Sequence, residues 1–220
     1  MIKSHKKIVF FIGARGGSKG LKNKNLIKIY KKTLLSWTIS QAKKSKFFYD
    51  LIISSDSEKI LKEAKKNGAT FLLKRPKNIS LDTSPKFLVW KHAIEIFEKK
   101  NNTKIDILVD LDCTNPLRYV YDIDKIIEKK IANKKCDAIV SIAPSRKNPY
   151  FNMLEINKKN NLIISKKINN WPSRRQDSPK VYDQVASIYC LDRKFIKDLD
   201  KKLDLEIIKY IFFKYKFHKA

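Results

Sequence analysis

Short runs that are apolar throughout alternate along this chain with longer stretches in which apolar residues recur every three to four positions. The uninterrupted runs predict strands buried on both faces, and the amphipathic stretches predict helices. The predicted strands are residues 7–14, 50–56, 70–75, 105–112 and 136–143. The predicted helices between them are residues 33–45, 57–68, 84–100 and 120–133. Strict alternation of this kind predicts an α/β fold with a doubly wound, mostly parallel sheet.

The pattern changes after residue 144. Residues 151–166, FNMLEINKKNNLIISK, predict a hairpin that turns at Lys158–Asn161, and a polar loop over 170–183 leads into a further strand over 186–192. We expect a single domain over 1–220, in which residues 145–186 form a small insertion that acts as a lid or a dimer arm.

Two helices carry further local signals. Asp56 or Ser57 is expected to cap the start of the second helix, and Gly68 to end it. Phe87, Trp90, Ile94 and Phe97 fall on one face of the third helix. We therefore expect that face to pack against the sheet.

Composition excludes several classes of protein. No stretch approaches the roughly 20 apolar residues of a membrane span, so no membrane partner is expected. The apolar run at 7–14 leads into RGGSKG without a cleavage site, which favours a buried strand over a signal peptide and predicts a cytoplasmic protein. Cys113, Cys136 and Cys190 show no CxxC spacing, which predicts reduced, buried thiols.

The formal charge of +27 raises the possibility of a nucleic-acid-binding protein. The lysines, however, occur all along the chain rather than in one stripe with interleaved aromatics, and their abundance together with Asn and Ile points to genomic base composition. We therefore expect no nucleic-acid partner. Only seven of the 49 basic residues are arginine. Six of these lie in loop-like stretches, where planar guanidiniums suggest an anionic ligand: Arg15, Arg75, Arg118, Arg146, Arg174 and Arg175.

The loop after the first predicted strand concentrates the glycines. Residues 10–26, FFIGARGGSKGLKNKNL, hold four of the five glycines of the chain together with Arg15, Lys19 and Lys24. The spacing fits neither GxxxxGK[ST] nor GxGxxG. Glycines let backbone amides approach an anion closely, and several cations suit a triphosphate better than one carboxylate. The alternative is a tight glycine turn with solvated lysines.

Residues 13–26, GARGGSKGLKNKNL, resemble the signature loop of the acylneuraminate cytidylyltransferases, also called CMP-sialic acid synthetases. The resemblance continues in order through LKRPKNISLDTS (73–84), DLDCTNPLR (110–118), SRKNPYFN (145–152) and RRQDSPKVYDQVASIY (174–189). These forms are most similar to the bacterial branch that activates legionaminic acid or related nonulosonates. The resemblance implies a Rossmann-like nucleotidyltransferase fold and a homodimer.

The resemblance also implies a reaction, in which the anomeric hydroxyl of a nine-carbon sugar acid attacks the α-phosphate of CTP with assistance from Mg²⁺. Pyrophosphate leaves, and the product is a CMP-sugar. By this resemblance the nucleotide is held by Arg15, Ser18, Lys19, Lys24, Asn25, Arg75, Ser80 and Thr83. The sugar acid is held by Asp112, Thr114, Arg118, Arg174, Arg175, Gln176 and Tyr182. Arg15, Lys19 and Asp112 would be catalytic, and Arg175 would pair with the sugar carboxylate through bidentate hydrogen bonds.

A short acidic segment is the candidate metal site. Asp198 and Asp200 in DLDKKLDL (198–205) resemble the family's DIDxxxDL segment, whose first two aspartates hold Mg²⁺. The family has a longer stretch before this segment, so two alternatives stay open: the segment is only the charged start of a helix, or the chain is a nucleotide-binding homologue that has lost activity. A cytidylyltransferase for an eight-carbon acid such as Kdo is a further alternative.

Overall fold

The computed structural model describes residues 6–17, 20–21, 23–170, 172–199 and 210–214, and of the last five only the backbone. The strands of its large sheet are β1 (Ile8–Gly13), β4 (Asp50–Ser55), β5 (Phe71–Lys74), β6 (Ile107–Leu111), β7 (Ala138–Pro144), β10 (Tyr182–Asp192) and β11 (Tyr210–Lys214). The helices are α1 (Leu34–Lys44), α2 (Glu58–Lys66), α3 (Lys86–Asn101), α4 (Val120–Ala132) and α5 (Arg193–Asp198). Two short hairpins, β2–β3 (Lys28–Ile29, Lys32–Thr33) and β8–β9 (Leu154–Ile156, Leu162–Ile164), and three single turns, η1 (Lys24–Leu26), η2 (Lys77–Ile79) and η3 (Arg175–Asp177), complete the described elements.

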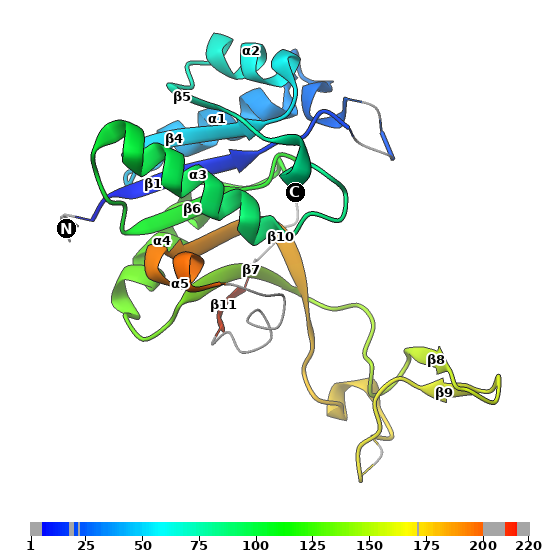
Figure 1. Ribbon diagram of the computed structural model, residues 1–220. Helices are drawn as coiled ribbons and strands as arrows, with labels where there is room; N and C mark the ends of the chain where they lie inside the picture. The colour runs from blue at the N-terminus through cyan, green and yellow to red at the C-terminus, as the bar shows by residue number, and fades with distance from the viewer. Residues whose placement is uncertain (1–5, 18–19, 22, 171, 200–209, 215–220) are drawn as a thin grey trace. The chain divides into compact units, whose positions relative to one another are not determined.

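The seven-stranded sheet has the order β11-β7-β10-β6-β1-β4-β5 (Figure 1). β1 pairs in parallel with β4 and with β6, so that Phe10 lies between Leu51 and Val109. β5 continues the parallel set beside β4, whereas β10 runs antiparallel to β6. The prediction of a mostly parallel α/β sheet is confirmed. Because β1, β4 and β6 are parallel and adjacent, the loops that follow them leave from one edge of the sheet.

Helix α3 shows why this sequence packs as it does. Phe87, Trp90, Ile94 and Phe97 recur at helical spacing, and each is buried against the strands of the sheet. Burying one such side chain stabilises the fold by roughly 1.5–3 kcal/mol relative to leaving it exposed. The predicted core face of this helix is confirmed, and its first turn is thereby fixed at the edge of the sheet where the loops emerge.

The ends of α2 differ in part from the sequence-based expectation. Ser57 is the N-cap residue, but its side chain makes no capping hydrogen bond, and Asp56 accepts from a distant loop instead. At the other end Gly68 adopts a φ of 78° directly after the C-cap residue Asn67. A left-handed backbone here favours glycine, which confirms Gly68 as the residue that ends the helix.

The chain divides into two compact units. The first contains the described residues up to Ser141 and from Ala186 to Phe213, and the second contains Ile142–Val185 and Lys214. The predicted hairpin is present in the second unit as β8–β9, with Asn160 at a φ of 60° in its turn. Whether residues 145–186 act as a lid or a dimer arm stays a prediction. None of the helices in the described ranges is long and apolar enough to cross a membrane.

Candidate functional site

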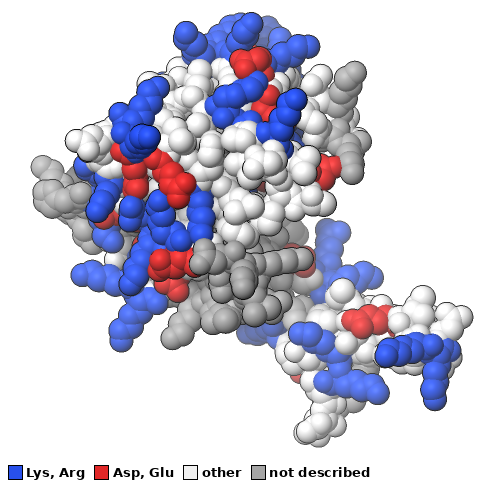
Figure 2. All heavy atoms as spheres, in the orientation of Figure 1, with Lys and Arg blue, Asp and Glu red and all other residues white. Residues whose placement is uncertain are grey.

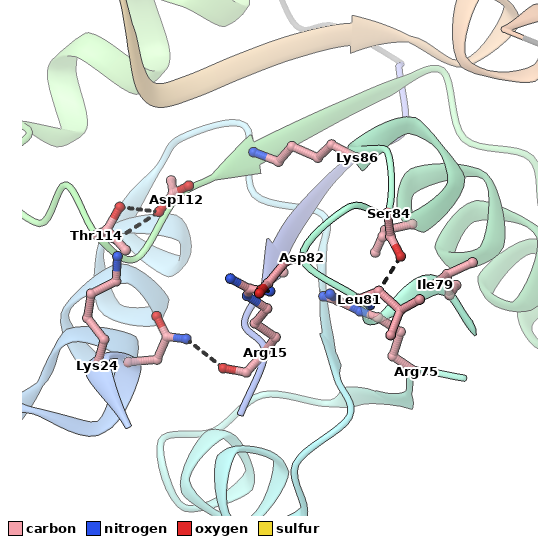
Figure 3. A pocket seen from close by; sticks show the side chains of 13 residues that line it. Arg15, Lys24, Arg75, Ile79, Leu81, Asp82, Ser84, Lys86, Asp112 and Thr114 are labelled. Atoms are coloured by element: carbon pink, nitrogen blue, oxygen red, sulfur yellow. Dashed lines mark hydrogen bonds and ion pairs between the residues drawn. The ribbon is translucent and has the colours of Figure 1, made fainter. Parts of the chain in front are cut away.

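A pocket of about 300 Å³ lies in the first unit, at the sheet edge where β1 and β6 end (Figure 3). Its walls come from the loop after β1, the turn η1, the segment between β5 and α3, and the loop after β6. The lining residues are Gly13, Arg15, Lys24, Asn25, Arg75, Ile79, Leu81, Asp82, Ser84, Lys86, Val89, Asp112 and Thr114. Four of these are basic and two are acidic. The structure therefore brings together four of the eight residues predicted to hold the nucleotide and two of the seven predicted to hold the sugar acid: Arg15, Lys24, Asn25 and Arg75, and Asp112 and Thr114.

Arg15 and Lys24 are the pocket cations from the glycine loop and the turn that follows it. Arg15 forms an ion pair with Asp82, and both side chains are about one-third exposed. Figure 3 shows the two side chains meeting in the middle of the pocket. Within the described part of the chain, no carboxylate is bonded to Lys24. An anionic ligand would thus meet one unpaired ammonium and one guanidinium that already holds an internal carboxylate.

Arg75 is a fixed part of the pocket wall. Its side chain is buried, its Nη2 donates to the Ser54 carbonyl at 2.8 Å, and its Nε donates to the Ser54 hydroxyl at 3.1 Å. Burial lowers the pKa of Arg75, and the neighbouring carboxylates of Asp56 and Asp110 oppose that shift. A guanidinium stays charged even so, because its ordinary pKa is far above neutrality. The pocket therefore carries a permanent positive charge whose position is set by β4.

Asp112 begins the loop after β6 and is partly exposed to the pocket. Its Oδ1 accepts hydrogen bonds from the Thr114 amide at 2.8 Å and from the Thr114 hydroxyl at 2.7 Å. This local turn holds the carboxylate in one orientation. Asp112 and Thr114 thus lie where the resemblance predicts contacts with substrate, and their roles in binding stay predictions.

Arg118 has a different setting from the one expected of a ligand-facing residue. It is buried, and it donates to the Ser187 carbonyl at 2.7 Å, to the Asp112 carbonyl at 2.9 Å and to the Gln41 side chain at 3.0 Å. It does not line the pocket. The structure therefore gives Arg118 the position of a residue that holds the Asp112 loop against β10.

A buried carboxylate behind the pocket was not singled out from the sequence. Asp110 is 1% exposed, and its Oδ2 accepts from Trp90 Nε1 at 2.8 Å and from Lys86 Nζ at 2.8 Å. Lys86 Nζ also lies 4.3 Å from the centre of the Tyr189 ring. Burial lowers the pKa of Lys86, but Asp110, Tyr189 and Asp112 outweigh it, so that pKa is raised. Lys86 therefore stays charged at neutral pH.

Composition and spacing could not have identified three further residues as parts of the site: Lys86, Asp82 and Asp56. Lys86 is one lysine in a chain crowded with them, and its importance comes from Asp110, 24 residues away in the sequence and adjacent in space. Figure 3 shows Lys86 reaching from the start of α3 toward the end of β6. A usable signal was present only for Asp110, which shares a strand face with Asp112.

The second unit contains a pocket of its own, of about 340 Å³. It is lined by Pro144, Ser145, Asn148, Arg175, Gln176, Ser178, Pro179, Lys180, Val181 and Tyr182. Arg175 Nη2 donates to the Ser145 carbonyl at 2.9 Å, and the buried Asn148 donates to the Pro179 carbonyl at 3.0 Å. The hydroxyl of Ser178 is buried without a hydrogen-bond partner in the described structure. Three predicted residues, Arg175, Gln176 and Tyr182, are thus brought together here.

Arg174 does not join that pocket. Its Nε and Nη2 donate to the two carboxylate oxygens of Asp177 at 2.9 and 3.0 Å, an ion pair within one turn. Ser80 donates to the Pro76 carbonyl and ends the turn η2, and Thr83 is exposed outside the lining residues. Ser18 and Lys19 lie outside the described residues, so their predicted roles stay predictions.

Asp198, the candidate metal residue that the structure describes, does not line the pocket. Asp198 is the exposed last residue of α5, and that helix is bonded to the second half of α3 through Arg193–Glu98 and Lys197–Glu95. Glu95 lies nine residues after the pocket residue Lys86, which is roughly 13 Å along a helix. Asp200 lies outside the described residues. No group of three or more potential metal ligands occurs in the ranges that the structure describes.

Figure 2 shows basic side chains spread over the visible face with acidic side chains among them. Several basic side chains form ion pairs with carboxylates, as in Lys46–Glu128 and Lys74–Glu58.

The three cysteines are free and buried, as predicted: Cys113, Cys136 and Cys190. Burial raises the pKa of Cys113 to about 12.

Known proteins resemble this chain over nearly its whole length. A family described as cytidylyltransferase matches residues 9–211. The "post-translational flagellin modification protein B" of Campylobacter coli is 36% identical over 226 residues, covering 93% of this chain and 94% of that protein. The "CMP-N,N'-diacetyllegionaminic acid synthase" of Campylobacter jejuni shows the same identity and the same coverage. Among solved structures, a CMP:2-keto-3-deoxy-manno-octonic acid synthetase complexed with CTP covers 96% of this chain and 90% of its own, with a TM-score of 0.70 and 16% identity, and thus shares the fold.

Proposed function

The chain belongs to the cytidylyltransferase family, and we propose that it transfers CMP from CTP to a nine-carbon sugar acid of the nonulosonate class, releasing pyrophosphate. The activity is that of a nucleotidyltransferase. The observation that carries the proposal is the convergence of Arg15, Lys24 and Arg75 on one pocket at the carboxyl edge of a parallel sheet. A relative that matches 93% of this chain and is named a CMP-N,N'-diacetyllegionaminic acid synthase favours a nonulosonate as the acceptor.

Charge neutralisation is the contribution we assign to the first pocket. Attack on the α-phosphate builds negative charge on the phosphoryl oxygens and on the leaving pyrophosphate, and fixed cations stabilise it without reorganising. Arg75 is fixed by its two bonds to Ser54, and Lys24 has no internal carboxylate bonded to it in the described structure. Arg15 would exchange Asp82 for a phosphate. No side-chain nucleophile is required by this chemistry.

Recognition of the sugar acid is the contribution we assign to the second pocket. Arg175 Nη2 donates one hydrogen bond to the Ser145 carbonyl, which orients the guanidinium. The other N–H groups of the guanidinium remain available to a carboxylate. Gln176 and Tyr182 line the same pocket and would meet hydroxyl or amide groups of the sugar. Prolines and Val181 supply apolar walls beside them.

Mg²⁺ is part of the proposal as the ion that accompanies CTP. Such an ion keeps several waters and needs only one or two carboxylates besides the phosphates. The partly exposed carboxylate of Asp112, which lines the pocket, suits this donor set, whereas Asp198 is bonded into neither pocket. When bound, the ion would supply further neutralisation of phosphate charge. Substituting Asp112 with Asn should raise the Mg²⁺ concentration needed for half-maximal activity more than Asp198→Asn does.

A homodimer in the cytoplasm completes the proposal. One face of the β8–β9 hairpin carries Leu154, Ile156 and Leu162, each more than half exposed, and an apolar face of this kind favours burial against another surface. Sedimentation should give the mass of two chains, and Ile156→Lys should shift it toward one. A nucleoside triphosphate substrate and three reduced cysteines agree with a cytoplasmic location.

The decisive test is pyrophosphate release by the purified chain with CTP and Mg²⁺. Legionaminic acid, N-acetylneuraminic acid and Kdo are offered separately, with ATP in place of CTP as the nucleotide control. We expect turnover with a nine-carbon acid and CTP. Turnover with Kdo alone would replace the proposed acceptor by an eight-carbon one. Calorimetric binding of CTP without any turnover would identify a homologue that binds nucleotide but no longer catalyses, and salt-sensitive binding of RNA or DNA without binding of CTP would overturn the proposal.

A further inference from the structure

Both polar ends of one peptide group in the glycine loop are bonded to side chains. The Arg15 carbonyl accepts from Asn25 Nδ2 at 3.1 Å, and the Gly16 amide donates to Asp56 Oδ1 at 2.8 Å. The carbonyl of residue 15 and the amide of residue 16 belong to the same planar unit. Asn25 comes from the turn η1, and Asp56 directly follows β4. The orientation of this peptide is therefore determined by two side chains from separate parts of the first unit.

The chain on either side of this peptide is also constrained. The Ala14 amide donates to the Ser54 carbonyl at 3.0 Å, which continues the β1–β4 pairing into the loop. On the other side, a Cβ at Gly16 would lie 2.8 Å from the Ser57 Cβ, so the loop is pressed against the start of α2. Only glycine fits such an approach without movement of the backbone. Arg15 thus projects into the pocket from a short segment held at three successive positions.

Asp56 makes this contact in place of a more usual local one. An Asp next to the start of a helix commonly caps it, yet the cap position of α2 falls to Ser57, whose side chain makes no capping bond. The Asp56 carboxylate instead spans 40 residues of sequence to the Gly16 amide. One amide of the loop is consequently bonded to an internal carboxylate and is not presented to an anion.

We propose that Asp56 is a positioning residue of the nucleotide site, which acts through the Arg15–Gly16 peptide to aim the Arg15 guanidinium at the phosphates of CTP. This inference rests on the proposed function for the identity of the ligand. Asp56 itself does not touch the nucleotide. Its acceptor atom, rather than its charge, is what the peptide requires, because an amide oxygen at the same place accepts the same hydrogen bond.

The test compares Asp56→Ala with Asp56→Asn, and uses Asp50→Ala as a matched control at the opposite end of the same strand. Asp56→Ala should raise the KM for CTP about tenfold and leave the KM for the sugar acid within twofold. Asp56→Asn should restore most of the loss, and Asp50→Ala should change neither KM. A KM for CTP that stays at the wild-type value in Asp56→Ala, or an Asn variant as impaired as the Ala variant, would overturn the assignment.

A double-substitution cycle separates positioning from a general structural role. If Asp56 acts through Arg15, then Asp56→Ala should have less than a twofold effect on the KM for CTP in an Arg15→Ala background. Independent, multiplying effects of the two substitutions would contradict the proposal.

A readout that needs no substrate keeps this inference distinct from the proposed function. The chain has five glycines, so selective ¹⁵N-glycine labelling gives a simple amide spectrum. The Gly16 amide should be protected from hydrogen exchange in the wild type and in Asp56→Asn, and should lose at least tenfold of that protection in Asp56→Ala. Equal exchange rates of the Gly16 amide in the wild type, Asp56→Asn and Asp56→Ala would refute the proposal that Asp56 holds the Arg15–Gly16 peptide. If the Gly16 amide loses protection in Asp56→Ala but the wild-type chain does not bind CTP, the positioning by Asp56 holds and the proposed function is wrong.

Discussion

The two pockets of this chain are built by different means. The pocket of the first unit gathers residues from four separate stretches of sequence, and much of its charge is already paired inside the protein, as in Arg15–Asp82 and Lys86–Asp110. The pocket of the second unit is lined by residues from 144–148 and 175–182, and side chains that line it donate to backbone carbonyls, as in Arg175–Ser145 and Asn148–Pro179. Nearly all of the buried apolar side chains of the described structure belong to the first unit.

This difference indicates how tightly each pocket is coupled to folding. In the first unit, a substitution at a buried, paired residue removes a bond between distant elements, so stability and activity should change together. In the second unit, most side chains are exposed, so a substitution should alter ligand binding with little effect on stability. Substitutions at paired residues of the first unit and at exposed residues of the second test this contrast.

Asp110→Ala should have the largest effect. It leaves Trp90 Nε1 and Lys86 Nζ without their shared acceptor, and removing one partner from such a buried arrangement costs about 3 kcal/mol. Urea unfolding at neutral pH measures the loss. Glu155→Ala, in the exposed hairpin of the second unit, should change the free energy of unfolding by less than about 0.5 kcal/mol. If Asp110→Ala and Glu155→Ala lowered the free energy of unfolding equally, the proposed difference between the two units would be wrong.

Arg175→Ala should have the second-largest effect, and it should change only the binding of the sugar acid. Losing a charge-assisted pair with the sugar carboxylate is worth about 2 kcal/mol, which corresponds to roughly a 30-fold rise in the KM for the acid. The KM for CTP and the unfolding midpoint should stay the same. Arg174→Ala is the matched control, since Arg174 is paired with Asp177, and it should shift the KM no more than about twofold. The reverse ranking of the two variants would show that the wrong arginine has been assigned.

Lys24→Met should weaken CTP binding about tenfold, or ~1.4 kcal/mol, because this pocket cation has no bonded carboxylate in the described structure and is available to a phosphate. Steady-state kinetics with CTP varied measures it. The same change at the exposed Lys28, four residues along, should have no measurable effect. Lys24 would be excluded as a phosphate ligand if the two variants behaved alike.

A smaller, pH-dependent effect concerns Glu98, which joins α3 to α5. Partial burial raises its pKa, but hydrogen bonds from Arg193 and from the Ile105 amide outweigh it, so the pKa of Glu98 is lowered. A lowered carboxyl pKa contributes stability above the unfolded value of about 4.5, and that stability is lost as pH falls through the lower folded value. Glu98→Gln should cost about 1 kcal/mol at pH 7 and less toward pH 3, as measured by chemical unfolding.

Much of the fold could be predicted from the sequence. The run 7–14 and the helical spacing in 84–100 gave the correct strand and helix, because an uninterrupted apolar run and a 3.6-residue period are properties of consecutive residues. Gly68 ended its helix as expected for the same local reason. The antiparallel β10 within the sheet depends on where the chain returns after the second unit, which no local pattern specifies.

The candidate site divides in the same way. Arg15, Lys24 and Arg75 were identifiable from their loops and the resemblance, and Arg175 from its motif. Asp82, Lys86 and Asp56 were not, and Arg118 was expected to face substrate but is buried among backbone carbonyls. Their roles depend on which strand lies beside which.

The order of residues was enough to predict that strands alternate with helices, that a glycine-rich cationic loop follows the first strand, and that most arginines lie in loops. Which of these groups contact one another depends on the tertiary structure. The Asp56 carboxylate and the Gly16 backbone amide are 40 residues apart in sequence, and they are adjacent because β1 and β4 pair in parallel with Gly13 opposite Ser54. Strand order and register place distant residues within bonding distance, and they depend on the burial of the whole sheet rather than on any one segment of it.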